Sequence, residues 1–188
     1  MASRTQEIID KLMRALANRQ YMHILNQLHI HIVPIKLTIE IPPAHPAQSS
    51  IQTKMSLQLC QFIKENETNI MIPQKQIWAV VDIYITQPLS IDGYLQIFKA
   101  DRQLGDFPSL NALNITNPGR HTLPLLPPEL TIFESGDALF VHFVPLGANN
   151  STKTIIESAA INVIIIDFTS TNLPNAEVSM IAYLMRNI

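Results

Sequence analysis

The sequence predicts an all-β domain, a sandwich of two antiparallel sheets, behind an N-terminal amphipathic helix. Residues 161–168 are apolar on both faces and contain no Gly or Pro, which is typical of a central strand covered on both sides. Between residues 30 and 145, apolar and polar side chains alternate in several short runs, as in half-buried strands. The first 28 residues instead carry apolar side chains at helical spacing.

Length and composition favour one domain that associates with other protein surfaces. A chain of 188 residues can bury a sizeable core without disulfides or metal. Charged residues make up 15% of the chain, against roughly 25% in ordinary soluble domains, and 47% are hydrophobic. With so little charge on its outside, the protein is expected to bury much of its surface against copies of itself or other proteins. The alternative is a large, Ile-rich core.

The same composition argues against several classes. The single cysteine, Cys60, allows no disulfide within the chain and no cysteine metal site, and we expect it to be a small buried apolar residue. A net charge of −2 without clustered Lys and Arg argues against nucleic-acid binding. No run reaches the roughly 18 apolar residues of a membrane-spanning helix. Charged residues interrupt the N-terminal segment, which argues against a signal peptide and predicts synthesis in a cytoplasm.

The helix is expected over residues 3–28, where Ser3 and Gln6 form a capping box. Its apolar stripe consists of Ile8, Ile9, Leu12, Met13, Leu16, Ile24, Leu25 and Leu28. Such a stripe packs on the domain, on a neighbouring subunit or on a lipid surface. We expect residues 1–28 to form a helical arm that contacts neighbouring subunits or a layer beneath them, and residues 29–188 to form the β-sandwich domain.

Eight strands follow the helix. They are expected at 30–41, 51–63, 76–87, 93–100, 111–116 or 129–133, 137–145, 153–169 and 176–187. Pro34 predicts a bulge or a sheet edge, because proline has no N–H to donate. Residues 101–128 form the longest irregular stretch and are expected to be an exposed or partner-binding loop. Eight strands with long, irregular connections fit a two-sheet sandwich, for which the single jelly roll is a standard arrangement.

No arrangement of residues predicts catalysis, a metal or a cofactor. His29 and His31 have the spacing of some metal-binding cupin barrels, but the other ligands of such a site are missing, so a polar strand end is expected. His142 is expected to be a satisfied or surface histidine. The chain has no nucleophile elbow and no Gly-rich phosphate loop, so we expect no enzyme. Glycosylation tripeptides begin at Asn66, Asn114, Asn149 and Asn150.

The chain resembles a viral family in its order of elements and in one turn. An amphipathic helix precedes eight strands, and Glu134-Ser135-Gly136-Asp137 is followed by the apolar run Ala-Leu-Phe-Val-His-Phe. In these features it resembles the single, vertical jelly-roll capsid proteins of icosahedral DNA viruses of archaea and thermophilic bacteria. The resemblance implies a capsid protein that assembles with copies of itself and other capsid subunits into capsomers of a virion. It also implies contact of the terminal arm with neighbours and, in many members, an internal membrane.

A β-sandwich binding module, such as a fibre or carbohydrate-binding domain, is the alternative. It would need an exposed aromatic platform, for which the sequence offers Tyr21, Trp78, Tyr84 and Tyr94.

Overall fold

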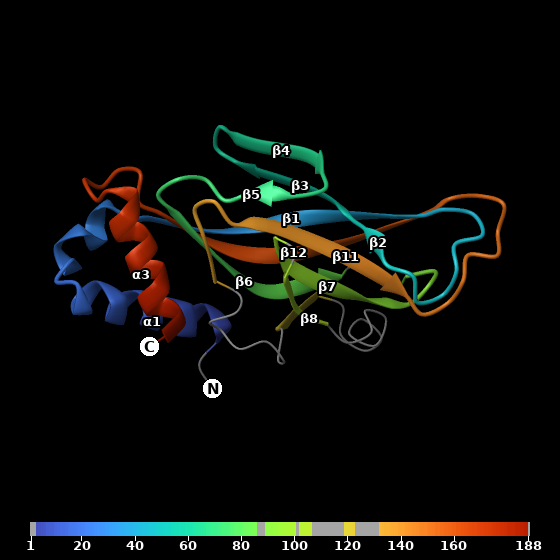
Figure 1. Ribbon diagram of the computed structural model, residues 1–188, viewed down its shortest axis with the longest axis horizontal. Helices are drawn as coiled ribbons and strands as arrows, with labels where there is room; N and C mark the ends of the chain where they lie inside the picture. The colour runs from blue at the N-terminus through green and yellow to red at the C-terminus, as the bar shows by residue number, and fades with distance from the viewer. Residues whose placement is uncertain (1–2, 86–88, 101, 107–118, 123–131, 188) are drawn as a thin grey trace.

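The protein is a long sandwich of two antiparallel sheets with helices packed at one end (Figure 1). The computed structural model describes residues 3–85, 89–100, 102–106, 119–122 and 132–187. The helices are α1 (Arg4–Asn18), the 3₁₀ helix η1 (Met22–Gln27) and α3 (Asn175–Asn187). The larger sheet contains, in spatial order, β10 (Ile132–Glu134), β6 (Gln76–Ile85), β12 (Ile155–Asp167), β1 (His29–Ile41), β3 (Lys54–Leu59) and β4 (Phe62–Glu67), with β9 (Gly119–Thr122) also paired to β6. The smaller sheet contains β2 (Ile51–Gln52), β11 (Ala138–Pro145), β7 (Gly93–Lys99) and β8 (Arg102–Asp106), with β5 (Ile70–Met71) also paired to β11.

The central strand is confirmed as β12. It pairs along its whole length with β1, from His29↔Asp167 to Ile41↔Ile155, and on its other side with β6. Ile161, Val163 and Ile165 face the smaller sheet across the main core, and all three are fully buried. Ile164 and Ile166 face the opposite way and are equally buried. A strand of this kind needs a layer on each side, and the second layer is helical.

The helices cover the outer face of the larger sheet at one end. From α1, the residues Ile8, Leu12, Ala15 and Leu16 are fully buried. From α3, the buried residues are Val178, Ile181, Ala182 and Met185. Both sets pack on apolar side chains of β6 and β12 in a second core. The Nη2 of Arg19 lies 2.6 Å from the Oε2 of Glu177, which ties the end of α1 to the first turn of α3.

The N-terminal helix is thus confirmed in type but ends earlier than expected. One half of the expected capping box is present, because Ser3 Oγ accepts a hydrogen bond from the N–H of Gln6 at 3.2 Å, whereas the side-chain amide of Gln6 donates to Asp10 Oδ1 at 2.8 Å. The α-helix stops at Asn18, Gln20 adopts a φ of 61°, and η1 then leads into β1. Of the three placements open from the sequence, the structure shows packing on the domain. Whether residues 29–188 fold without this helix stays a prediction.

The strand expected over 176–187 is wrong, because α3 occupies this segment. Its apolar residues fit two periods at once. Val178, Ala182 and Leu184 fall on alternate positions, but Val178, Ile181, Ala182 and Met185 recur at the spacing of a helix, and these four are the buried ones. Pro174 starts the first turn, where its carbonyl accepts the N–H of Val178 at 3.2 Å. Only a helix places these four side chains on one face against the second core, so tertiary packing favours the helix over the strand.

The single strand expected over 51–63 is also wrong, since this segment forms β2, β3 and the start of β4. Thr53 is buried where the chain passes from the smaller sheet to the larger one, and its N–H and Oγ–H both donate to the carbonyl of Val141. Cys60 is exposed rather than buried, at a φ of 51° in the turn between β3 and β4. No Gly or Asn marks that turn in the sequence.

The remaining strands agree with the expectation only in part. The strands expected at 30–41, 76–87, 93–100 and 137–145 are confirmed, with bounds shifted by a few residues. Residues 111–116 lie outside the described residues, and β10 begins at Ile132, at the end of the other expected range. The short strands β5, β8 and β9 were not expected.

We expect Ile164→Asp to abolish soluble folding. Ile164 is fully buried between the sheet and the helices, and an unpaired buried charge costs several kcal/mol of a total stability of roughly 5–15 kcal/mol. The matched control is Ile156→Asp, on the same strand and the same face but 66% exposed, which should remain soluble. Soluble yield and thermal melting measure both. An I164D variant that melts like the wild type would show that the helical layer is loosely attached.

Leu12→Ala tests the attachment of α1 directly. Because Leu12 is fully buried, we expect the free energy of unfolding to fall by about 2–5 kcal/mol. Chemical denaturation provides the measurement. Gln6→Ala, on the exposed side of the same helix, is the control and should change stability by no more than about 0.5 kcal/mol. Equal midpoints for both variants would contradict the packing of α1 on the sheet.

Candidate functional site

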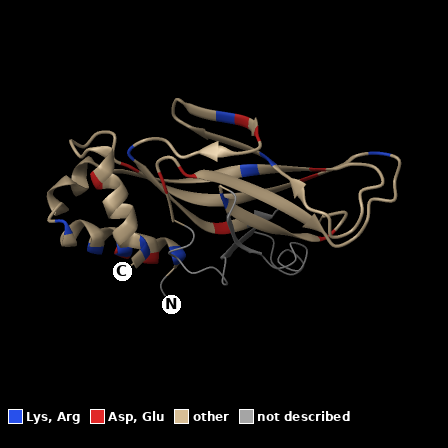
Figure 2. Cartoon of the chain, in the orientation of Figure 1, with Lys and Arg blue, Asp and Glu red and all other residues tan. Residues whose placement is uncertain are grey.

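Charge is sparse and mixed over the described surface. Figure 2 shows Lys and Arg interspersed with Asp and Glu, with no extended stretch of one sign among the residues coloured. Several charges neutralise each other locally, such as Lys54 with Glu40 at 3.1 Å and Arg186 with Glu134 at 2.8 Å. The hydrogen bond from Arg19 holds the pKa of Glu177 below its ordinary value. This pattern offers no electrostatic footprint for a polyanion in the described part of the chain.

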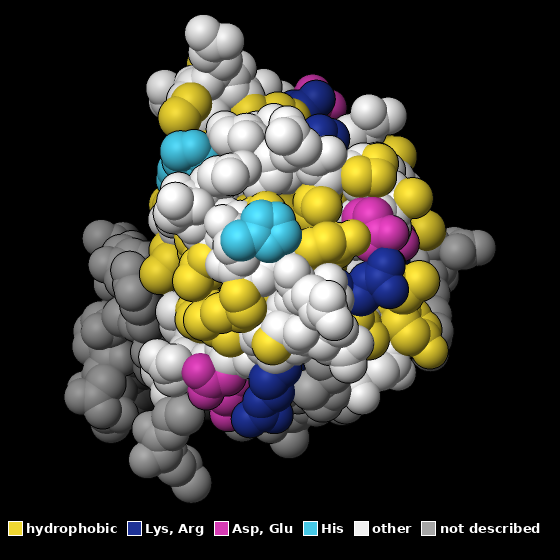
Figure 3. Space-filling model, turned by 90° about the vertical axis from the view of Figure 1, so that its left-hand side faces the viewer, with side chains coloured by type: hydrophobic (Ala, Val, Ile, Leu, Met, Phe, Trp, Pro, Cys, Tyr) yellow, Lys and Arg dark blue, Asp and Glu magenta, His cyan; other side chains and the backbone are white. Residues whose placement is uncertain are grey.

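The helical end presents exposed apolar side chains. Figure 3 looks onto this end and shows apolar side chains gathered between polar ones, with a few charged groups among them. Three of the large exposed apolar residues belong to its helices: Met22 on η1, and Met180 and Tyr183 on α3. No helix in the described residues is both long and apolar enough to span a bilayer.

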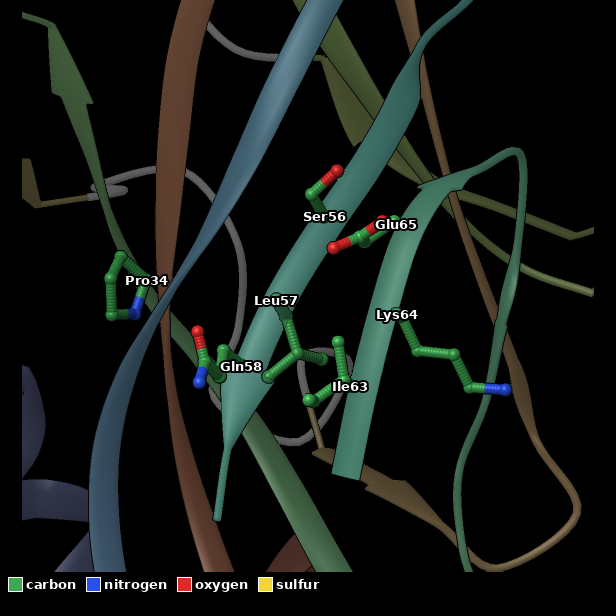
Figure 4. Close-up of a pocket in the computed structure, with 7 residues that line it drawn as sticks. All are labelled: Pro34, Ser56, Leu57, Gln58, Ile63, Lys64 and Glu65. Atoms are coloured by element: carbon green, nitrogen blue, oxygen red, sulfur yellow. The ribbon is translucent and has the colours of Figure 1, made fainter. Parts of the chain in front are cut away.

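A groove lies where β3 and β4 turn away from β1. β3 pairs with β1 only from Lys36 to Thr38, so from His29 to Ile35 this edge of β1 has no partner strand among the described residues. The groove has a volume of about 290 Å³. Figure 4 shows Pro34 on one side and residues of β3 and β4 on the other; the lining is Pro34, Ser56, Leu57, Gln58, Ile63, Lys64 and Glu65. Of the bulge or sheet edge expected at Pro34, the described residues show a local edge, where Pro34 pairs with Asn162 of β12 and β3 has already left β1.

The groove continues an apolar stripe. Ile30 and Ile32 on β1 are 40% and 51% exposed, and Ile63 on β4 is 52% exposed. An unpaired strand edge beside exposed apolar side chains is the feature by which sheets accept a further strand or a neighbouring surface. Pro34 limits such pairing, because it offers no N–H.

An aromatic pocket of about 380 Å³ lies on the outer face of the smaller sheet. Leu139, Val141 and Phe143 of β11 point into the main core, so Phe140 and His142 point outward. The register places Phe140 directly opposite Phe98 of β7, and His142 opposite Gln52 of β2. Ala100 completes the described lining. This arrangement, Gln52, Phe98, Ala100, Phe140 and His142, is called the aromatic pocket below.

His142 is the one titratable group of the aromatic pocket's described lining. Its ring centre lies 4.6 Å from that of Phe98, with the planes tilted by 42°. Partial burial lowers the pKa of His142 from its ordinary value of 6.5, so the ring is neutral at pH 7. No protein group in the described part of the chain is hydrogen-bonded to its ring nitrogens or to the amide of Gln52.

The other histidines expected from the sequence form no site in the described residues. His29 and His31 lie on β1 with their rings stacked, 6.4 Å apart and inclined by 10°. They are a polar strand end beside η1, as expected. No group of three His, Cys, Asp or Glu side chains with the arrangement of a metal site occurs among the described residues.

The candidate glycosylation positions differ in role. Asn149 is buried and clamps a loop: its Nδ2 donates to the carbonyls of Ile41, Pro42 and Lys153, each at 3.0 Å. Its Oδ1 accepts from the N–H and the hydroxyl of Ser151. Asn66 and Asn150 are exposed, and Asn114 lies outside the described residues.

The four aromatic residues that the sequence offered for a platform are not in the described lining of the aromatic pocket. Trp78 is 1% exposed and its Nε1 donates to Gln76 Oε1, so it belongs to the main core. Tyr21 and Tyr94 are half-buried and do not line the aromatic pocket, and the side chain of Tyr84 lies outside the described residues. The sequence did carry a signal for Phe140 and His142, since both alternate with the apolar core residues of their strand.

Comparison of this chain with protein-family models and with curated proteins finds no match.

The environment of His142 can be tested by its titration. We expect an NMR midpoint below 6.5, and we expect Phe98→Ala to move it toward 6.5 by admitting water. Because the folded pKa is lower than the unfolded one, acid favours the unfolded chain: the contribution to stability is complete above pH 6.5 and is lost as the pH falls through the folded pKa. A midpoint at or above 6.5 in the wild type would contradict the burial of the ring.

Proposed function

We propose that this protein is a capsid subunit with a single jelly-roll fold, which assembles with copies of itself and other capsid subunits into the shell of a virion. The observation that supports the proposal is the nesting of the strand pairs. β1 pairs with β12, β2 with β11, β6 with β10, and β7 with β8. Apart from β3, β4, β5 and β9, the strands are therefore nested: the first pairs with the last, and each next strand inward pairs with the next from the other end. A long antiparallel ribbon that is folded over in this order curls into a jelly roll.

The surface supports assembly. Low charge and exposed apolar residues are features of proteins that bury their outside against partners. The groove and the free edge of β1 form one contact in this proposal, in which a neighbouring subunit covers Ile32 and Ile63. The apolar stripe of α1 is already used by the sheet. Contact with a layer beneath the shell, such as an internal membrane, would therefore fall to the exposed residues of the helical end (Figure 3).

Particle size tests the proposal. We expect the purified wild-type protein to form particles in the megadalton range by light scattering and electron microscopy. Ile63→Glu should reduce particle formation at least tenfold while leaving the melting temperature unchanged, because Ile63 is exposed in the groove and a charge there must be desolvated on contact.

Ile156→Glu is the matched control, since Ile156 is an isoleucine of the same sheet that lies outside the groove and is 66% exposed, more than the 52% of Ile63. It should assemble like the wild type. A wild-type protein that stays monomeric at every concentration would overturn the shell function. Normal particles from I63E would leave the shell function standing and exclude the groove as a contact.

The aromatic pocket favours a second candidate, a binding module. A pocket with an apolar floor and a few converging polar groups is the usual form of a small-molecule site. A wild-type monomer in solution would make this the leading function.

A further inference from the structure

The aromatic pocket has no part in the shell proposal, and its described lining restricts what it can hold. None of these lining residues is charged, so no counter-charge is present there for an ionic ligand. The volume of about 380 Å³ lies near the lower end of the range for small-molecule sites, roughly 300–1,000 Å³, and fits a single ring better than an extended molecule.

The floor of the aromatic pocket, Phe98 and Phe140, is apolar, whereas its rim, His142 and Gln52, is polar. Phe98 and Phe140 lie side by side on adjacent strands and are each only partly buried, which provides an apolar aromatic surface open to solvent. His142, two residues after Phe140 on β11, lies opposite Gln52 of β2. The neutral imidazole carries one donor and one acceptor, and the amide carries both kinds of group. Neither side chain is hydrogen-bonded within the described part of the protein.

We propose that the aromatic pocket binds a neutral sugar ring, with the C–H face of the ring on Phe98 and Phe140 and its hydroxyls at His142 and Gln52. Hydroxyl groups both donate and accept, which matches a rim that does the same. A pure hydrocarbon would leave the polar groups of the rim desolvated without partners, at a cost in affinity. A carboxylate or phosphate would find no cation in the described lining.

The chief competitor is an aromatic side chain of another protein, which would also stack on the two phenyl rings. The two occupants differ in their need for the rim. A sugar would form hydrogen bonds to Gln52 through its hydroxyls, whereas an aromatic ring would only stack on Phe98 and Phe140.

The test is saturation-transfer NMR on the full-length wild-type protein with methyl glycosides of glucose, galactose, mannose, xylose and N-acetylglucosamine. Glucuronate serves as the charged probe, and p-cresol as a mimic of an aromatic side chain. We expect saturable transfer to the C–H protons of at least one neutral glycoside and none to glucuronate. Phe140→Ala should weaken that binding at least about tenfold, and Gln52→Ala about threefold or more.

Tyr183→Ala, which removes an exposed aromatic residue from the helical end, is the control and should bind like the wild type. Gln52 is exposed, so Q52A keeps the test valid even if F140A is poorly folded. No transfer to any neutral glycoside, or equal binding by wild type and Q52A, would overturn the proposal, as would binding of p-cresol alone. Particle size is independent of these outcomes, so failure here leaves the shell function untouched.

Discussion

The structure depends on burying a strand that is apolar on both faces. β12 lies between β1 and β6, and its two sets of isoleucine and valine side chains point into different cores. A single sandwich covers only one of these faces. The helices α1 and α3 supply the other cover, which is why a protein of mostly β structure carries helices from both ends of the chain packed on one another. The N-terminal helix is therefore packed on the strands and does not lie free of them.

Strand faces could be predicted from the sequence, because apolar and polar side chains alternate along each half-buried strand. Features that depend on tertiary contacts could not be predicted in this way. The faces of β1, β7 and β11 follow from the sequence because one side of each is buried. In α3, Val178 and Ala182 satisfy both a strand and a helix, and the choice depends on the shape of the layer that the second core requires. At Thr53 the chain changes sheets within what the sequence predicts as one strand, and this step is held by two bonds from the N–H and the hydroxyl of Thr53 to the carbonyl of Val141.

The candidate sites, too, are predictable from side-chain alternation only in part, and otherwise depend on tertiary contacts. Alternation places Phe140 and His142 outside the core, but only the pairing register brings Phe98 and Gln52 beside them. The groove next to β1 was signalled by Pro34 as an edge, whereas its depth arises because β3 leaves β1 after Lys36. Asn149 shows the reverse case: a tripeptide that suggests an exposed modification site is a buried clamp with its side chain fully bonded.

The pairing of β1 with β12 also governs when the protein can form. These strands are joined by more than 110 intervening residues, since β1 ends at Ile41 and β12 begins at Ile155. Contacts so distant along the chain give a high contact order, which slows folding because the loop must close before the contacts stabilise it. During translation β1 has no main neighbour to pair with until β12 has left the ribosome. Apolar strands held open for that time are prone to aggregate, so the chain is expected to rely on chaperones during its synthesis in the cell.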